Sequence, residues 1–211
     1  MAPYEISFQI EGPFALWNRP DQGAVAASYP APTWSALKSI AECVAFLRGK
    51  EGAGRAYIRP TRVEIGSPIR FDRYVTNYRG PLKETAKTTY QLQATVLVDV
   101  AYRVHCLCEP FTRADFAAAH QLQEMFVRRL QKGQTAKTPC LGWREFMPTY
   151  FGPFAESNGH TIRFQKQHDF QVMIPSLLLN MWDSPIGGSY KPAFRDVEVK
   201  NGEMLYPHPY L

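Results

Sequence analysis

Residues 89–107 form a long, strongly β-branched stretch, and this stretch limits the fold more than any other feature of the chain. β-Branched side chains lose rotamer freedom in a helix and fit an extended, half-buried backbone, so the stretch predicts strand. Asp99, near its middle, is a candidate turn residue between two halves. We therefore expect a sheet to which residues 89–107 contribute one or two strands.

Two amphipathic helices are expected, one on either side of this stretch. Thr33 caps a helix that runs to about Arg48, and Thr112 or Asp115 opens a second helix that ends near Gly133. In both helices apolar residues recur at spacings of three and four, which indicates a buried face. These residues are Trp34, Leu37, Ile40, Ala41, Val44 and Leu47 in the first, and Phe116, Ala119, Leu122, Met125, Phe126 and Leu130 in the second.

Further strands are expected at residues 4–10, ended by Gly12 and Pro13, and at 56–65 and 68–75. Shorter strands are expected at residues 161–173, 177–182 and 197–205. The order strand, helix, strands, helix, strand indicates an α+β protein. We expect a ferredoxin-like (RRM-like) N-terminal domain over residues 1–148 and a small C-terminal antiparallel β region over residues 149–211.

The composition excludes few classes of function. Lys and Arg number 24 against 19 Asp and Glu, and the net charge of +5 permits a polyanionic partner without demanding one. No apolar run approaches the ~20 residues of a membrane span, and the first residues lack the regions of a signal peptide, so a cytoplasmic protein with no membrane partner is expected. No CxxC pair occurs, and His160, His168 and His208 have no metal-ligand spacing, so we expect neither a metal nor another cofactor.

The segment 18–32 is too long for a plain connection and is partly apolar. We expect RNA or a neighbouring subunit to order it. Tyr29 and Trp17 lie in or beside this loop, where they could stack on bases or simply anchor the loop.

Three stretches together resemble a known family. Residues 8–17 (FQIEGPFALW) are similar to its first strand and aromatic turn, and residues 29–42 (YPAPTWSALKSIAE) to the entry of its first helix. Residues 125–146 are the most specific, with an arginine-rich helix end, a Gly-Gln turn and a Leu-Gly-x-Arg-Glu-Phe segment. By these motifs the chain is identified as a member of the CRISPR-associated Cas-five (Cas5) family, type I-C (Dvulg) subtype, in the RAMP superfamily.

The resemblance implies a ferredoxin-like domain and a metal-free cut at the base of the hairpin in the repeat transcript. It also implies that the protein then stays on the 5′ handle of the mature guide RNA. The implied partners are CRISPR repeat RNA, mature guide RNA, the backbone and large subunits of the interference complex and, indirectly, target DNA.

Metal-free RNA cleavage uses the strand's own 2′-OH as nucleophile, with a base, an acid and a cation that stabilises the phosphorane. The family's proposed set is a Tyr near the end of the first helix and a Lys-His pair early in the second. Counting along the matched motifs places these positions at Ala45, Gln121 and Leu122. His120 adjoins the last two. The candidate catalytic residues are therefore His120, Tyr29 and Lys38.

The candidate RNA-binding residues are Arg128, Arg129, Lys132 and Arg144. Guanidinium groups pair bidentately with phosphate, which favours RNA contact. The alternatives are a solvated helix end that satisfies its terminal carbonyls and, for Arg144, an ion pair with Glu145. Two functions stay open: a ribonuclease that also caps the RNA 5′ end, and a structural subunit without catalysis. The arginine-rich helix end disfavours a third, an unrelated β-rich binding protein.

Overall fold

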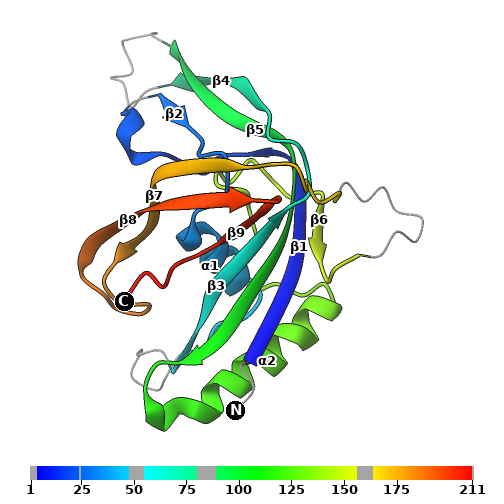
Figure 1. The fold of residues 1–211 in the computed structure, drawn as a ribbon, viewed down its shortest axis with the longest axis vertical. Coiled ribbons are helices and arrows are strands. Elements are labelled where there is room, and N and C mark those ends of the chain that lie inside the picture. The colour runs from blue at the N-terminus through cyan, green and yellow to red at the C-terminus, as the bar shows by residue number, and fades with distance from the viewer. Residues whose placement is uncertain (1–3, 24, 48–54, 80–88, 156–163, 211) are drawn as a thin grey trace.

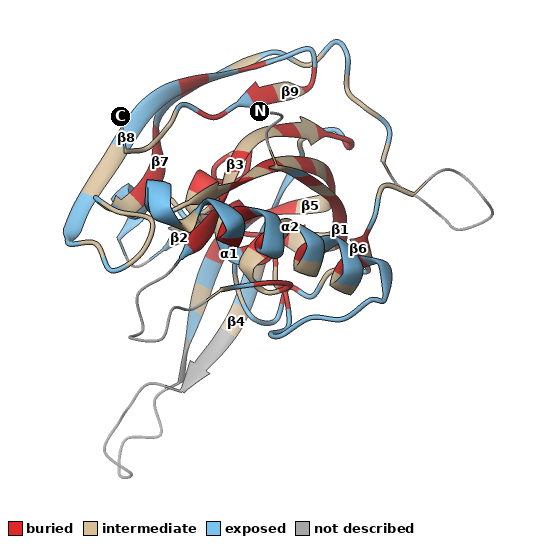
Figure 2. Ribbon diagram, turned by 90° about the horizontal axis from the view of Figure 1, so that it is seen from below, coloured by how far each residue is buried: buried red, intermediate tan, exposed pale blue. Residues whose placement is uncertain are grey.

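The computed structural model describes residues 4–23, 25–47, 55–79, 89–155 and 164–210. A nine-stranded sheet curls through the molecule, and two α-helices cover one of its faces (Figures 1 and 2). The path through the sheet is β6 (Tyr150–Gly152), β1 (Tyr4–Ala15), β5 (Thr89–Pro110), β3 (Ala56–Ile65), β9 (Glu203–Leu205), β8 (Tyr190–Lys200) and β7 (Val172–Trp182), while β2 (Ala26–Ala27) and β4 (Phe71–Arg79) also pair with β5. The chain is thus a mixed, strand-rich α+β protein, as expected.

The β-branched stretch forms one strand, β5, so the expected turn at Asp99 is wrong. Strand β1 pairs with β5 on both sides of this residue, with Gly12 opposite Val100 and Phe14 opposite Val98. Asp99 has a positive φ of 52° and lies opposite Pro13, which has no N–H to donate. The β1–β5 pairing therefore continues on both sides of the positive φ at Asp99. Strand β1 accordingly runs past Gly12 and Pro13 to Ala15.

The helices are α1 (Trp34–Glu42) and α2 (Phe116–Gln131), the latter preceded by the short 3-10 helix η2 (Arg113–Asp115). The Thr33 side chain accepts a hydrogen bond from the Ala36 N–H, which confirms the expected N-cap. Helix α1 ends at Glu42, before the expected Arg48, and the carbonyl of its C-cap residue Cys43 accepts hydrogen bonds from a later segment of the chain. Both helices turn their buried sides to the strands (Figure 2), and Trp34 and Phe126 are fully buried there.

The C-terminal strands continue the central sheet. Strand β9 pairs with β3, with Arg62 opposite Leu205, and β8 and β7 follow it (Figure 1). The strand expected at residues 161–173 begins only at Val172 in the structure. Residues 161–163 of the expected strand lie outside the described residues. The expected strand at 197–205 is two strands, because Asn201 and Gly202 turn the chain with positive φ values.

Candidate nucleic-acid interface

Four exposed cations lie on the last turn of α2 and in the segment that follows it: Arg128, Lys132, Lys137 and Arg144. Within the part of the chain that the structure describes, none of them has an ion-pair or side-chain hydrogen-bond partner. The alternative pairing of Arg144 with Glu145 is absent there, and burial and the nearby Glu145 carboxylate raise the pKa of Tyr74. Free cations this close along the chain can contact successive phosphates.

Arg129 differs from its neighbours, because its guanidinium is already used inside the protein. Its Nη1 donates to the Val44 carbonyl at 2.9 Å, just beyond α1. The backbone N–H groups of Ala136 and Lys137 donate to the Cys43 carbonyl at 2.7 and 3.2 Å. The end of α1 is thus held by α2 and by the turn after it. Arg129 therefore binds a backbone carbonyl, which is the alternative to RNA contact that the sequence left open for this residue.

A tight turn presents Arg144. Leu141 and Phe146 are buried, and the Leu141 N–H donates to the Phe146 carbonyl at 2.9 Å. The Leu141 carbonyl in turn accepts from the Leu16 N–H at 2.9 Å, which ties the turn to the end of β1. Gly142 has a φ of 98°, and a Cβ on it would lie 2.0 Å from the Leu16 carbonyl oxygen. Only glycine therefore fits this turn.

Gly142→Ala is expected to destabilise the fold more than Gly133→Ala. Both glycines have positive φ values, but a Cβ at Gly133 meets nothing within 4 Å. Gly133→Ala, the control, should therefore lose only about 1–3 kcal/mol of unfolding free energy, from a Cβ at a positive φ. Gly142→Ala adds a clash of the new Cβ with the Leu16 carbonyl. Urea unfolding of the two variants measures the difference. Equal losses of unfolding free energy would show that the turn relaxes freely.

His120 lies on the exposed side of α2, near the start of β1. Its ring centroid is 5.4 Å from that of Tyr4, and its Nε2 is 3.5 Å from Glu124 Oε1. One turn along, the Gln123 amide donates to the Glu5 carbonyl at 2.8 Å, so α2 is fixed against the edge of β1. His120 is thus a solvent-accessible imidazole at a defined place.

Tyr29 is only 4% exposed and belongs to the core. Its hydroxyl donates to the Ser176 carbonyl at 2.8 Å and accepts from the Leu178 N–H at 3.3 Å, and burial raises its pKa. Trp17 is equally buried and donates to the Tyr102 hydroxyl at 3.2 Å. Both residues therefore anchor the loop. Neither of them offers a face on which a base could stack.

The described part of the 18–32 segment is anchored within the chain itself. Ala26 and Ala27 pair with β5, and the Ser28 N–H donates to the Thr95 carbonyl at 2.9 Å. A 3-10 helix, η1 (Pro20–Gln22), precedes them. These contacts correct the expectation that a partner must order the segment.

Lys38 forms an ion pair with Glu42 at 2.5 Å and borders a cavity of about 440 Å³ beside Gly187 and Gly188. Helix α1 packs on β3 and β7, whereas α2 packs on β1 and β5. The three candidate catalytic residues are accordingly spread over different parts of the fold: Tyr29 against β7, Lys38 near the β7–β8 turn and His120 at the start of β1.

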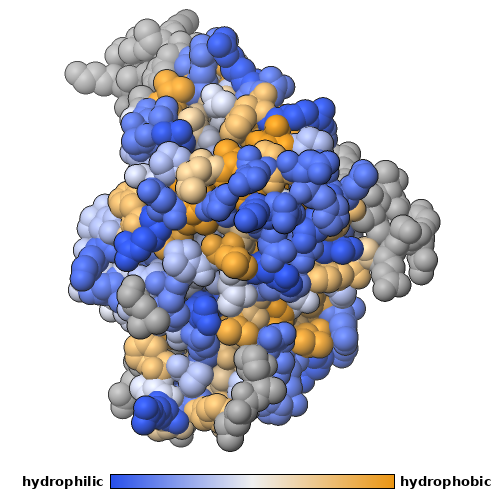
Figure 3. Space-filling view, in the orientation of Figure 1, coloured by the Kyte–Doolittle hydropathy of each residue, from blue (hydrophilic) through white to orange (hydrophobic). Residues whose placement is uncertain are grey.

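The sheet face opposite the helices is hydrophilic around its centre (Figure 3), but its charges compensate one another. Arg59 pairs with Glu109 at 2.7 Å, and Glu203 accepts from both Arg62 at 3.1 Å and Lys166 at 2.9 Å. Cations neutralised in this way are poor phosphate ligands, so the free cations beside α2 are the better candidates. Sequence patterns did not reveal this network, because its members come from distant strands.

The sequence profile of a family described as CRISPR-associated protein (Cas_Cas5) matches residues 5–202. The chain belongs to this family.

Curated relatives agree with this membership. A "CRISPR pre-crRNA endoribonuclease Cas5d" of Thermus thermophilus is 33% identical over 151 residues, which are 70% of this chain and 63% of that relative. The match thus spans less than two thirds of the relative's length. A relative of the same name from Mannheimia succiniciproducens is 26% identical over 232 residues, covering 97% of this chain and 96% of the relative. The recognition of a Cas5 protein of the type I-C kind is confirmed.

Solved structures share the fold. One, described as a CRISPR-associated protein, has a TM-score of 0.69 at 16% identity and covers 97% of this chain and 92% of its own. Another, a functionally uncharacterized protein from Streptococcus mutans, has a TM-score of 0.66 at 18% identity and covers 97% and 93%. The overall arrangement of this Cas5 family member thus recurs in solved proteins.

Two of the three positions counted for the family's catalytic set are buried in this Cas5 family member. Ala45 is fully buried and Leu122 is 1% exposed, so neither position reaches solvent, while Gln121 is exposed. His120 is the exposed imidazole next to them. Among the described residues no group of three His, Cys, Asp or Glu side chains could hold a metal ion, and no helix is long and apolar enough to cross a membrane.

Proposed function

We propose that the chain is a guide-RNA-binding subunit of a type I interference complex that cuts the repeat transcript without a metal and then caps the 5′ handle. The observation that carries this proposal is that Arg128, Lys132 and Arg144 are exposed and have no ion-pair partner among the described residues, while His120 is exposed on the helix that carries Arg128. The activity for which the two curated relatives are named, pre-crRNA endoribonuclease, supports it.

In the proposed reaction the 2′-oxygen attacks the adjacent phosphorus. The P–O2′ bond forms and the P–O5′ bond breaks, which leaves a 2′,3′-cyclic phosphate and a 5′-OH. The proton lost by the 2′-OH goes to a base, and an acid gives one to the departing 5′-oxygen. His120 is suited to one of these transfers. Arg128 lies a little over two helical turns further along α2 and about 80° around its axis, where it can hold a phosphate of the bound strand.

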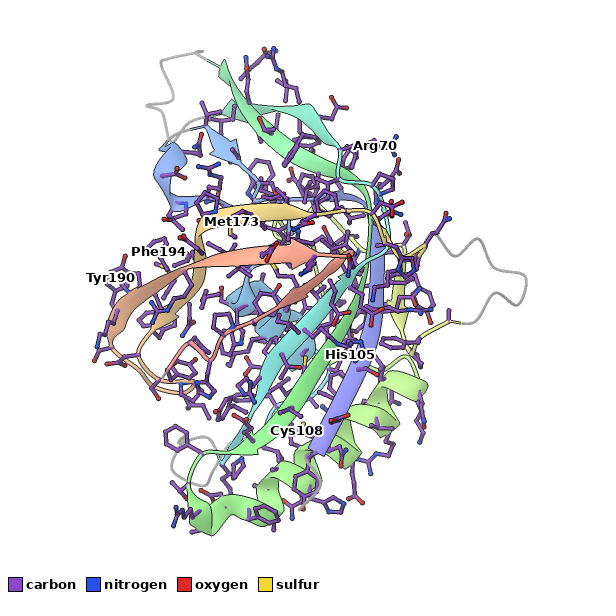
Figure 4. The ribbon with its side chains drawn as sticks, viewed as in Figure 1. Arg70, His105, Cys108, Met173, Tyr190 and Phe194 are labelled. Carbon is purple, nitrogen blue, oxygen red and sulfur yellow. The ribbon has the colours of Figure 1, made fainter. Side chains whose placement is uncertain are left out.

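We also infer that the N-terminal part is ferredoxin-like, with residues 149–211 as its β-rich extension. The strand order β6-β1-β5-β3, antiparallel throughout, with α1 after β1 and α2 after β5, supports this assignment. We place the protein in the cytoplasm with the backbone and large subunits as neighbours and target DNA as an indirect partner. Exposed apolar side chains on β7 and β8, including Met173, Tyr190 and Phe194 (Figure 4), support contacts with such subunits.

A second candidate function is a subunit that holds the guide RNA without cutting it. The buried Ala45 and Leu122 favour it, because the side chains that the family uses for proton transfer are missing at these positions.

Incubation of the purified protein with its own repeat RNA in EDTA tests the proposal. We expect a single cut that persists in EDTA and disappears when the nucleotide before the cut carries a 2′-deoxyribose, because the nucleophile is then missing. Tight binding without a cut would favour the second function. Absence of both cutting and binding would contradict the two functions together.

A further inference from the structure

A cavity of about 640 Å³, bordered by α2, lies at the free edge of β1. Strand β6 covers this edge only at residues 9–11, so within the described residues Glu5 and Ser7 have no strand beside them on that side. Val127 and Gln131 of α2 form one wall, and Pro153 and Phe154 form another. The volume lies within the range of about 300–1,000 Å³ that is typical of small-ligand sites.

The inner wall is His105 of β5 (Figure 4), and its ring is held in a fixed state. Its Nε2 lies 3.0 Å from Glu64 Oε1, and Arg62 Nη2 lies 3.2 Å from its Nδ1 and 3.1 Å from its Nε2. The ring is thus held between a carboxylate, which accepts, and a guanidinium, which donates. Burial and the Arg62 charge lower the pKa of the imidazole, so it stays neutral near neutral pH. His105 is therefore a rigid, uncharged part of the wall.

The lining is unsuited to a phosphate. Arg62 is the one lysine or arginine among the lining residues, and it already pairs with Glu203 at 3.1 Å and lies 3.6 Å from Glu64. The exposed Glu5 carboxylate adds a negative charge at the rim. An anion entering the cavity would therefore find no uncompensated cation and would meet an acidic side chain.

The same lining suits a nucleobase. Within the described residues the Ser7 hydroxyl and the Gln131 amide have no side-chain hydrogen bond, so they are free to pair with the edge of a base. Phe154 supplies an aromatic surface, edge-on to His105 at 5.3 Å and with the Arg103 guanidinium 5.0 Å from its centroid. Unstacked RNA bases are held in this way, by an aromatic ring and by hydrogen bonds to their edges.

The surroundings of the cavity supply the phosphate contacts. Arg128 and Lys132 each follow a lining residue, Val127 and Gln131, by one position on α2. One residue turns a helix by about 100°, so these two cations point from the cavity wall towards solvent, on the outer side of α2. We infer that a strand whose phosphates rest on them can turn a base over Val127 into the cavity.

We propose that this cavity binds one unstacked base of the RNA while Arg128 and Lys132 hold the flanking phosphates. The inference rests on the proposed RNA-binding function and adds to it the chemical class of the group that enters this cavity. His105, Arg62 and Glu64 then act as positioning residues for the wall.

An abasic scan tests this proposal. The repeat RNA is made with one abasic nucleotide at each position in turn, and the affinity of every RNA for the full-length protein is measured. Removal of the bound base should weaken binding about 10-fold at one position, since a stacked base contributes about 1–3 kcal/mol. Val127→Trp, which fills the cavity from an exposed site on α2, should weaken binding of intact RNA by a similar factor and abolish the effect of that abasic position.

Val25→Trp makes the same change at an exposed valine outside the cavity and should keep the native profile. Phe154→Ala provides a second test that does not depend on filling the cavity, and it should flatten the scan at the same position. Thermal melting shows whether the two cavity variants are folded. If both are folded and still show the native dependence of affinity on the abasic position, the proposal is overturned. Uniform affinity of the native protein for all abasic RNAs would also overturn it and would leave the proposed function intact. Absence of RNA binding by the native protein would overturn the proposed function and this inference together.

Discussion

His120→Ala is expected to slow cleavage of the repeat RNA by about 10²- to 10⁴-fold, the usual contribution of general acid–base catalysis. The imidazole is exposed on α2, with only Glu124 Oε1 at 3.5 Å and the Tyr4 ring against it. Its removal should therefore leave the core intact and the affinity for RNA nearly unchanged. Single-turnover cleavage with excess protein isolates the chemical step from product release, which matters for a protein that keeps its product.

His168→Ala is the matched control, because His168 is also exposed and lies outside α2. It should cleave at the native rate. Full activity of a folded His120→Ala protein would exclude His120 from proton transfer. Since Tyr29 is buried and bonded to Ser176, Lys38 would then be the next residue to replace.

Arg128→Glu combined with Lys132→Glu is expected to weaken binding of the repeat RNA by about 100-fold or more. A hydrogen bond to a charged group is worth about 1.5–3 kcal/mol, and two such contacts would be replaced by repulsion. The slope of log affinity against log salt should fall by about 1.4, since each phosphate contact on a single strand contributes about 0.7. Filter binding over a series of salt concentrations measures both quantities.

Lys200→Glu makes the same kind of charge change at an exposed lysine on β8 and should alter affinity little. An unchanged salt slope in the double variant would assign Arg128 and Lys132 to a solvated helix end. Arg129 is kept native in this test, because its bond to the Val44 carbonyl makes any loss of RNA binding on its replacement ambiguous.

The sequence determined the elements whose signal is local. Thr33 and the three-and-four spacing after it specify α1, and the same spacing specifies α2, because a cap and an apolar face are properties of neighbouring residues. The motifs in residues 125–146 likewise identified the family.

Tertiary structure decided which of these side chains are free to bind. Arg128 and Arg129 are adjacent and alike in sequence, yet among the described residues Arg129 donates to the Val44 carbonyl, just beyond α1, and Arg128 has no such bond. Tyr29 looked accessible in a proline-rich loop, but β7 closes over it from a distant part of the chain. The cavity beside β1 needs β1, β3, β5 and α2 together. Such contacts depend on which distant segments the fold brings together, and the spacing of neighbouring residues along the chain does not predict this.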